Sequence, residues 1–339
     1  MTSFLSAQIC RSLPMVETGS SSSLSEIMFL IYNIICAVNI KLIFKQQHQN
    51  FPMKPLTVNK AFVRKVLPER KPWSHKGDFG KLLVIGGSRR YSGSPALEAL
   101  AAYRTGCDLV VVAAPERAAN TIASFSPDII TEPLKGDYLN SWHLKSLLEL
   151  SENADAVVIG GGLGRRKETL SAVVKFLGSV NLPCVIDADA IHAAGEVRDA
   201  IKNNFILTPH SHEFFVLSGE KPSQRLSERV KQVQKLASSL DTTILLKGHI
   251  DVISSSSRTA INRTGNPCMT KGGTGDTLAG ICGAFLAMGI EPFKSACAAS
   301  YVNGCAGDIA AREFGTSMLA SDMIFTLTEV MKELNRKLP

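Results

Sequence analysis

Short apolar runs alternate with amphipathic stretches along the chain from residue 81 onward. The apolar runs are continuous rather than alternating with polar residues, which is typical of parallel strands buried on both faces. This pattern predicts strands at residues 81–85, 109–113, 156–159, 184–187, 205–207 and 243–246. The alternation of strands with helices predicts an α/β fold built on one doubly wound, mostly parallel sheet flanked by helices.

The stretches between the strands have the hydrophobic spacing of helices, and Pro95 suits the first turn of the first one. These helices are predicted at residues 95–105, 116–124, 141–150, 167–177 and 225–240. Two short runs, 250–254 and 258–262, flank a serine-rich turn and predict a late hairpin. Three C-terminal helices are predicted at about residues 276–288, 292–314 and 320–337.

Residues 1–52 differ in composition from the rest of the chain. Residues 53–339 are predicted to form a single domain. Polar residues interrupt the apolar stretch 27–44, and the stretch is shorter than the ~20 apolar residues of a spanning helix. A membrane anchor is therefore disfavoured. A disordered or targeting extension and a start of translation at Met53 remain alternatives, of which the start at Met53 is favoured.

The charge of the chain is modestly positive, with 37 Lys and Arg against 30 Asp and Glu and a formal net charge of +7. No basic cluster or set of stacking aromatics accompanies it, which argues against nucleic-acid binding and favours a small anionic ligand. Arg89 and Arg90 either steer such a ligand or are solvated loop charges. The eight cysteines lack metal-binding spacing and fit a reducing compartment, so we expect a cytoplasmic protein.

The most informative motif is the loop 266–276, in which Gly-Gly-Thr-Gly-Asp opens directly into an apolar helix. Glycines let backbone amides approach a ligand, and the amides at a helix start bind anions. An anion hole is expected from the amides of Gly273, Thr274 and Gly275. Asp276 is either an N-cap or a general base beside the bound anion, and the three glycines favour the base. The loop is not a P-loop, because it lacks the G-x-x-x-x-G-K-[ST] pattern.

Other polar residues follow the predicted strands, where ligands bind in such sheets. Asp187 and Asp189 are equally compatible with magnesium or ligand binding and with a cap or turn. His210 and His212 form a pair of possible metal ligands beside Glu213, but an isolated pair does not establish a zinc site. A hydrogen-bonding or stacking role for His210 and a helix start at His212 are favoured over zinc. The sequence assigns no metal ligands.

Several motifs together resemble one family. They occur in order at residues 80–88, 92–96, 158–164, 186–189, 207–213, 246–248 and 266–276. Over residues 57–337 the chain resembles the NAD(P)H-hydrate dehydratase family, which has a ribokinase-like fold. The resemblance implies a lyase that repairs nicotinamide nucleotides. It would dehydrate the S form of hydrated NADH or NADPH at the expense of ADP, giving AMP and phosphate, with Mg²⁺ as cofactor and a homotetramer as assembly.

The resemblance also implies roles for individual residues. Contacts with the hydrated dinucleotide fall on Ala96, Gly164, His210 and Asp276. Contacts with the ADP or AMP nucleotide fall on Lys247, Gly248, His249, Ile250, Asp251 and Gly275. Asp276 would be the base that removes a proton from the ring hydroxyl as it is phosphorylated, after which the phosphate leaves more readily than hydroxide.

Alternatives to this reaction stay open. An ATP-dependent version would differ in the loop 266–276, which looks like that of the ADP-using branch. A vitamin or sugar-alcohol kinase of the same fold, and a nucleotide-binding regulatory protein without chemistry, would share the glycines. Family members often carry an epimerase domain of about two hundred residues before this one, too long for residues 1–52. We therefore expect dehydration without epimerisation.

Overall fold

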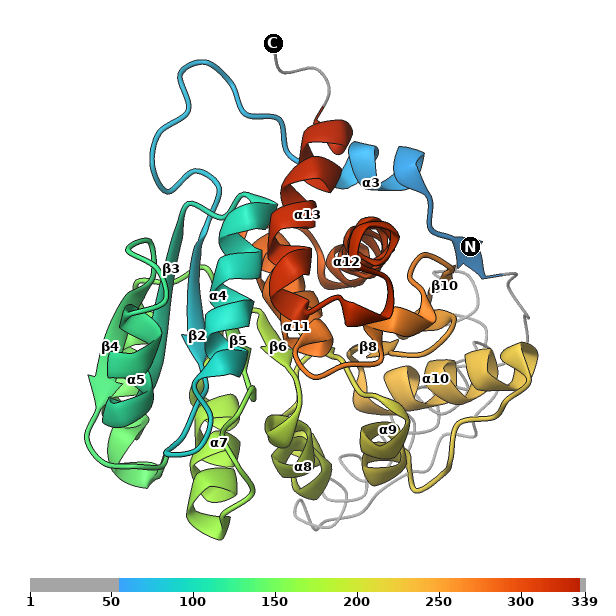
Figure 1. Ribbon diagram of the computed structural model, residues 1–339. Coiled ribbons are helices and arrows are strands. Elements are labelled where there is room, and N and C mark those ends of the chain that lie inside the picture. Colours follow the sequence, from blue (N-terminus) through green and yellow to red (C-terminus); the bar gives the residue numbers. More distant parts are fainter. Residues whose placement is uncertain (1–54, 336–339) are drawn as a thin grey trace, which may run out of the picture. The chain divides into compact units, whose positions relative to one another are not determined.

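The computed structural model describes residues 55–335, and within them ten strands form one sheet (Figure 1). The strand order is β1-β10-β9-β8-β7-β6-β5-β2-β3-β4. In chain order the strands are β1 Leu56–Thr57, β2 Lys81–Ile85, β3 Leu109–Pro115, β4 Ile130–Leu134, β5 Ala156–Ile159, β6 Cys184–Ile186, β7 Phe205–Leu207, β8 Thr243–Leu246, β9 Asp251–Ser254 and β10 Thr259–Asn262.

Seven strands from β4 to β8 pair in parallel, and β9 pairs antiparallel with both β8 and β10. The predicted parallel sheet and late hairpin are therefore confirmed. Every residue of β5, β6, β7 and β8 is buried, as the continuous apolar runs indicate. The carboxyl ends of these parallel strands all meet at one edge of the sheet.

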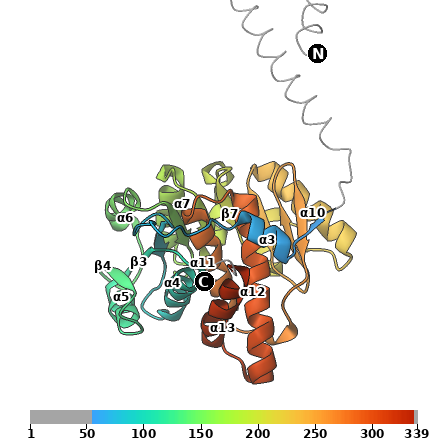
Figure 2. The same ribbon diagram turned by 90° about the horizontal axis from the view of Figure 1, so that it is seen from above.

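Helices cover both faces of the sheet (Figure 2). Their bounds are α3 Lys60–Val66, α4 Gly93–Thr105, α5 Glu116–Ala123, α6 Leu144–Ser151, α7 Lys167–Ser179, α8 Asp189–Glu196, α9 Ser211–Ser218, α10 Leu226–Leu240, α11 Thr274–Ala287, α12 Pro292–Phe314 and α13 Ala320–Leu334. Buried residues of α3, α4, α5, α11, α12 and α13 form one core cluster. Residues of α6 to α10 form a second cluster on the opposite face.

Alternate residues along one strand pack into the two core clusters on opposite faces of the sheet. Leu82 and Val84 of β2 lie in the first cluster, whereas Leu83 and Ile85 lie in the second. This alternation follows from the two-residue period of a strand. Small residues dominate α4 and α11, and these two helices pack closely: a Cβ added at Gly280 would lie 2.2 Å from the Glu98 backbone oxygen. The close packing fixes α11, which carries the glycine-rich loop at its start.

Some boundaries and short elements differ from the sequence prediction. The strand predicted at 184–187 ends at Ile186, the helix predicted from Pro95 begins at Gly93, and the last helix ends at Leu334. The strand β4 was not predicted, because it is an exposed edge strand that contains a proline and lacks a continuous apolar run. The short elements β1, α3 and α8 were missed as well, since two to eight residues give little periodic signal.

None of the helices described between residues 55 and 335 is long and apolar enough to cross a membrane. The predicted extension at residues 1–52 lies outside the described residues.

Candidate active site

The two glycine-rich turns that follow β2 and β5 are bonded to each other at the carboxyl edge of the sheet. The Gly87 amide donates to the Gly161 carbonyl over 2.8 Å, and the Ser88 hydroxyl donates to the Gly162 carbonyl over 2.8 Å. A Cβ at Gly162 would lie 2.8 Å from the Tyr91 Cβ, so the turns leave no room for a side chain there. These close approaches explain why both turns are rich in glycine.

Asp276 lies in the first turn of α11, two residues after the helix start at Thr274. The N-cap is Gly273, at φ +98°, so the alternative that Asp276 is the cap is wrong. A side chain at Gly273 would also meet the Ala320 Cβ at 2.6 Å. The first amides of a helix have no partner within the helix, so those of Thr274 and Gly275 can receive an anion. The predicted base and the predicted anion hole therefore lie on one helical turn.

The Asp276 carboxylate is largely buried, and its surroundings make it a stronger base. Burial raises the pKa of Asp276 to about 6, and the nearby Asp187 charge adds to the increase. A hydrogen bond from Ser94 and the positive charge of Lys247 act in the opposite direction and lower the pKa. A carboxylate with this pKa is ionised at neutral pH and accepts a proton more readily than an ordinary aspartate.

Lys247 connects the strand ends β6, β7 and β8 at this edge. Its Nζ lies 2.8 Å from the Asp187 Oδ1 and 3.9 Å from the Glu213 Oε2. Burial lowers the pKa of Lys247, but the charges of Asp187 and Glu213 outweigh it and the net shift is upward. A Cβ at Gly275 would lie 3.4 Å from this Nζ, so the lysine lies beside the start of α11. The cation, the base and the helix amides share one location, which suits an anionic group in transfer.

Asp187 and Asp189 follow β6 and face different partners. Ala188 between them has φ +47°, an unusual value for a residue other than glycine. Besides Lys247, Asp187 accepts a hydrogen bond of 2.5 Å from Thr208. Asp189 instead accepts bonds from the Gly164 amide (2.8 Å) and from the Arg165 Nε (2.9 Å). Asp187 therefore lies in the candidate site, which fits ligand or magnesium binding. Asp189 instead stabilises the glycine-rich turn, which fits the alternative of a cap or turn.

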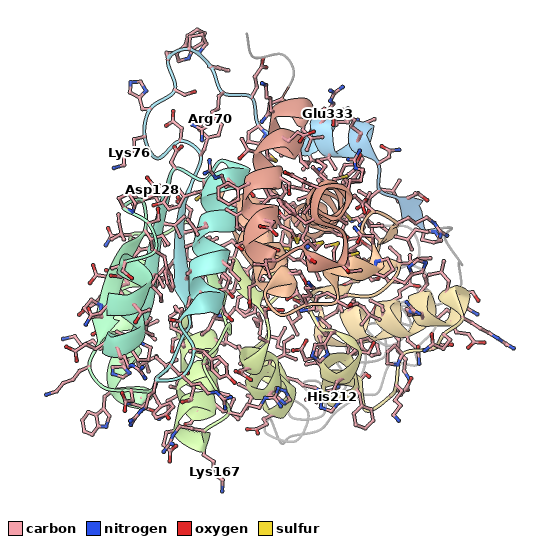
Figure 3. The ribbon with its side chains drawn as sticks, viewed as in Figure 1. Arg70, Lys76, Asp128, Lys167, His212 and Glu333 are labelled. Carbon is pink, nitrogen blue, oxygen red and sulfur yellow. The ribbon has the colours of Figure 1, made fainter. Side chains whose placement is uncertain are left out.

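His210 is the N-cap of α9, and its side chain is half-exposed. Its Nδ1 accepts bonds from the amides of His212 and Glu213, and the Glu213 carboxylate accepts a bond from the His210 amide over 2.8 Å. Burial, followed by the charge of Lys247, lowers the pKa of His210, which favours the neutral ring. The capping box occupies Nδ1, and the His210 Nε2 lies 3.3 Å from the Glu213 Oε1. Among the described residues His210 belongs to no group of three side chains that could hold a metal ion, and its contact with a ligand stays a prediction. Figure 3 shows His212 at the same edge of the molecule as the starts of α8 and α9.

The remaining predicted residues are placed less directly. Ala96 is buried in the first turn of α4, where its side chain belongs to the core. The Asp251 carboxylate accepts bonds from the Gly248 amide (2.9 Å) and the Ser300 hydroxyl (2.6 Å), which closes the turn through His249 and Ile250. Contacts of these residues with nucleotide or dinucleotide stay predictions.

The arginines next to the first glycine-rich turn have partners of their own. Arg89 forms an exposed ion pair of 3.2 Å with Asp137, and the Arg90 guanidinium lies over the Tyr91 ring at 5.5 Å. These contacts agree with solvated loop charges and give no direct support to a steering role.

The residue that sequence analysis missed is Glu98, in the middle of α4. Its side chain has no exposed surface, and neither carboxylate oxygen has a hydrogen-bond partner. Each of Glu98, Asp187 and Asp276 offers an oxygen, and these oxygens all lie within 4.8 Å of one another. Burial, followed by the charges of Asp276 and Asp187, raises the pKa of Glu98 well above its usual value. Among the described residues these three carboxylates are the group that could hold a metal ion.

One sequence signal for Glu98 existed. It is the single acidic residue of α4, whose other buried positions are alanine, proline and threonine. A charged residue on the apolar face of a small-residue helix is rarely buried without a partner.

Comparisons with known proteins identify the family of this chain. The sequence pattern of the NAD(P)H-hydrate dehydratase family matches residues 82–329. The bifunctional NAD(P)H-hydrate repair enzyme Nnr of Pyrobaculum aerophilum is 46% identical over 265 residues, which are 78% of this chain and 52% of that protein. The chain thus spans about half the length of the first curated relatives. The ADP-dependent (S)-NAD(P)H-hydrate dehydratase of Cenarchaeum symbiosum is 39% identical over 276 residues, 81% of this chain and 96% of that protein.

Solved structures give the same result. The ADP/ATP-dependent NAD(P)H-hydrate dehydratase of Bacillus subtilis, crystallised with ATP and Mg²⁺, superposes with a TM-score of 0.71 at 28% identity, over 83% of this chain and 99% of that chain. A ribokinase-like superfamily protein of Enterococcus faecalis superposes with a TM-score of 0.74 at 26% identity, over 84% of this chain and 98% of that chain. From its sequence and its fold, this chain belongs to the NAD(P)H-hydrate dehydratase family and has a ribokinase-like fold.

Proposed function

We propose that this chain dehydrates the S form of hydrated NADH and NADPH, using ADP and releasing AMP and phosphate. The observation that carries the proposal is the Asp276 carboxylate beside Lys247 and the first amides of α11. This combination can deprotonate a hydroxyl and hold the phosphoryl group that the hydroxyl receives. The relatives that match over nearly their whole length are named ADP-dependent (S)-NAD(P)H-hydrate dehydratases.

The reaction has two steps in this proposal. Asp276 removes the proton of the ring hydroxyl as its oxygen attacks the β-phosphorus of ADP, and the bond from that phosphorus to the AMP oxygen breaks. Lys247 and the α11 amides offset the negative charge on the transferred phosphoryl group. In the second step the lone pair of the ring nitrogen expels phosphate, and loss of a ring proton restores the dihydronicotinamide.

Positioning of the hydroxyl is the second contribution of the protein. The attacking oxygen must lie about 3–3.5 Å from phosphorus before transfer. The Ser94 hydroxyl bonds Asp276 and so orients the carboxylate. We assign the substrate side of this site to Ala96, Gly164 and His210, and the nucleotide side to the residues from Lys247 to Asp251 with Gly275.

Mg²⁺ fits this site by the chemistry of its side chains. Carboxylate oxygens are the ligands that Mg²⁺ prefers, and the buried oxygens of Glu98 have no other partner. Asp187 and Asp276 would hold the ion next to the nucleotide phosphates. When bound, Mg²⁺ neutralises phosphate charge and so aids transfer.

ADP rather than ATP is proposed as donor. The loop 266–276 has the composition expected of the ADP-using branch, and the archaeal relatives carry ADP in their names. The Bacillus subtilis neighbour is named for both nucleotides. The cytoplasmic location and the homotetramer expected from the sequence stay predictions.

A spectroscopic assay tests the function. Hydrated NADH, Mg²⁺ and either ADP or ATP are mixed with the protein, and the return of NADH absorbance near 340 nm is followed. We expect recovery with ADP, one AMP formed per NADH, and no recovery without nucleotide. Consumption of ATP with a vitamin or sugar alcohol, but no NADH recovery with either nucleotide, would contradict the proposal and support a kinase of the same fold.

A further inference from the structure

Glu98 has no structural role that explains its burial. It lies on the inner side of α4, against the glycine-rich turn after β5, with no exposed surface. Neither of its carboxylate oxygens has a hydrogen-bond partner. A polar group that is buried without a partner destabilises the fold unless something compensates it.

The surroundings of Glu98 are shaped to admit its carboxylate. A Cβ at Gly161 would lie 2.4 Å from the Glu98 Oε1, so a residue with a side chain at 161 would displace it. Oxygens of Asp187 and Asp276 lie within 4.8 Å of an oxygen of Glu98. The three carboxylates come from α4, the end of β6 and the start of α11, and they converge on one point.

The charges at this point do not balance. Lys247 provides one positive charge, and its 2.8 Å ion pair is with Asp187. Arg165, at the same edge, is paired with Asp189 at 2.9 Å. Among the described residues no ion pair joins a cation to Glu98 or to Asp276, although Lys247 lies near Asp276. A divalent cation bound to the three carboxylates would favour their ionised form.

We propose that Glu98, Asp187 and Asp276 together bind one divalent cation, Mg²⁺ or Mn²⁺, directly and before any nucleotide is present. Three carboxylates leave further coordination positions of an octahedral ion open, and water or a phosphate oxygen fills them. Glu98 is the anchor of the site, because it is the deepest of the three ligands. The cation is then a resident part of the site rather than one that arrives only with the nucleotide.

The test is a titration of the nucleotide-free protein with Mn²⁺. Binding is measured as the decrease of the free Mn²⁺ signal in electron paramagnetic resonance. We expect one Mn²⁺ per chain, displaced by Mg²⁺. In Glu98→Gln the affinity should fall at least about tenfold, since loss of even an outer-shell partner costs that much. Glu149→Gln is the matched control: it removes the same charge from an exposed side chain whose ion pair is 3.7 Å long, and it should bind Mn²⁺ like the wild type.

A second measurement separates a binding role from a structural one. Without cation, Glu98→Gln should melt at the wild-type temperature or above, because glutamine has the size of a protonated glutamate and needs no buried charge. Mg²⁺ should raise the melting temperature of the wild type and of Glu149→Gln but not that of Glu98→Gln. If Glu98→Gln does not fold, the same Mn²⁺ titration is made with Asp276→Asn, which should also bind Mn²⁺ more weakly than the wild type.

Two results would overturn the inference: no Mn²⁺ bound by the nucleotide-free wild type, or an unchanged affinity in Glu98→Gln (or in Asp276→Asn where that variant replaces it). The titration contains neither hydrated dinucleotide nor ADP. Its failure is therefore distinct from failure of the proposed dehydratase reaction.

Discussion

Burial changes the acid–base behaviour of individual side chains at this site. Glu213, which is 3% exposed, has its pKa raised by burial to about 7, although Lys247 opposes the shift. The folded state therefore holds a proton that the unfolded state releases near its ordinary pKa of 4.5. Stability from this proton is fully present below pH 4.5 and is lost as the pH rises to about 7.

A comparison of the wild type with Glu213→Gln isolates this effect. The glutamine oxygen can still accept the bond from the His210 amide, but the side chain cannot ionise. We expect the unfolding free energy of the wild type to fall relative to that of the variant, by on the order of 2 kcal/mol between pH 5 and pH 8. Urea denaturation of both proteins at the two pH values measures it. A constant difference would mean that Glu213 keeps its ordinary pKa.

Motifs and the family resemblance predicted several residues of the candidate site, and their roles stay predictions. Asp276, Lys247 and His210 were assigned from motifs, and the structure brings all three to the carboxyl edge of the sheet. Glu98 was not found: it is the single acidic residue of α4, but its convergence with Asp187 and Asp276 depends on a contact between α4 and α11 that no local pattern contains. The division of work between Asp187 and Asp189 depends on the backbone at Ala188, which the sequence also does not reveal.

At the scale of elements, the start of α11 is the feature on which the anion hole depends. Gly273 needs its positive φ and the absence of a side chain, whereas a Cβ at the neighbouring Gly272 meets nothing within 4 Å. We expect Gly273→Ala to lower the unfolding free energy by on the order of 1–3 kcal/mol and to weaken ADP binding.

Gly272→Ala is the matched control and should change stability by less than about 0.5 kcal/mol. Thermal unfolding and ADP calorimetry on both variants provide the comparison. Equal stability of the two variants would contradict the view that packing against Ala320 sets the position of this loop.

The elements themselves were predictable where they are long or fully buried. The buried strands and the long helices follow directly from apolar runs and helical spacing. The edge strand β4 was not, since its residues are mostly exposed and nothing forces a strand pattern on them. The helix α9 was anticipated only at its start, from Glu213 in the first turn.

For the whole molecule, the described residues 55–335 supply a ten-stranded sheet with a core cluster on each of its faces. We therefore expect residues 53–339 alone to fold and to dehydrate the substrate at the rate of the full chain. Expression of both forms, with melting temperature and NADH recovery compared side by side, tests this. A shorter form that does not fold would show that residues 1–52 contribute to the domain.

The central claim for the molecule is that the Asp276 carboxylate takes the proton of the substrate hydroxyl. The most direct measurement is the rate of NADH recovery by Asp276→Asn at saturating ADP, with ADP binding measured in the same preparation. We expect the rate to fall at least about 100-fold, as loss of a general base does, while the protein stays folded and still binds ADP. A rate within about tenfold of the wild type would contradict the account.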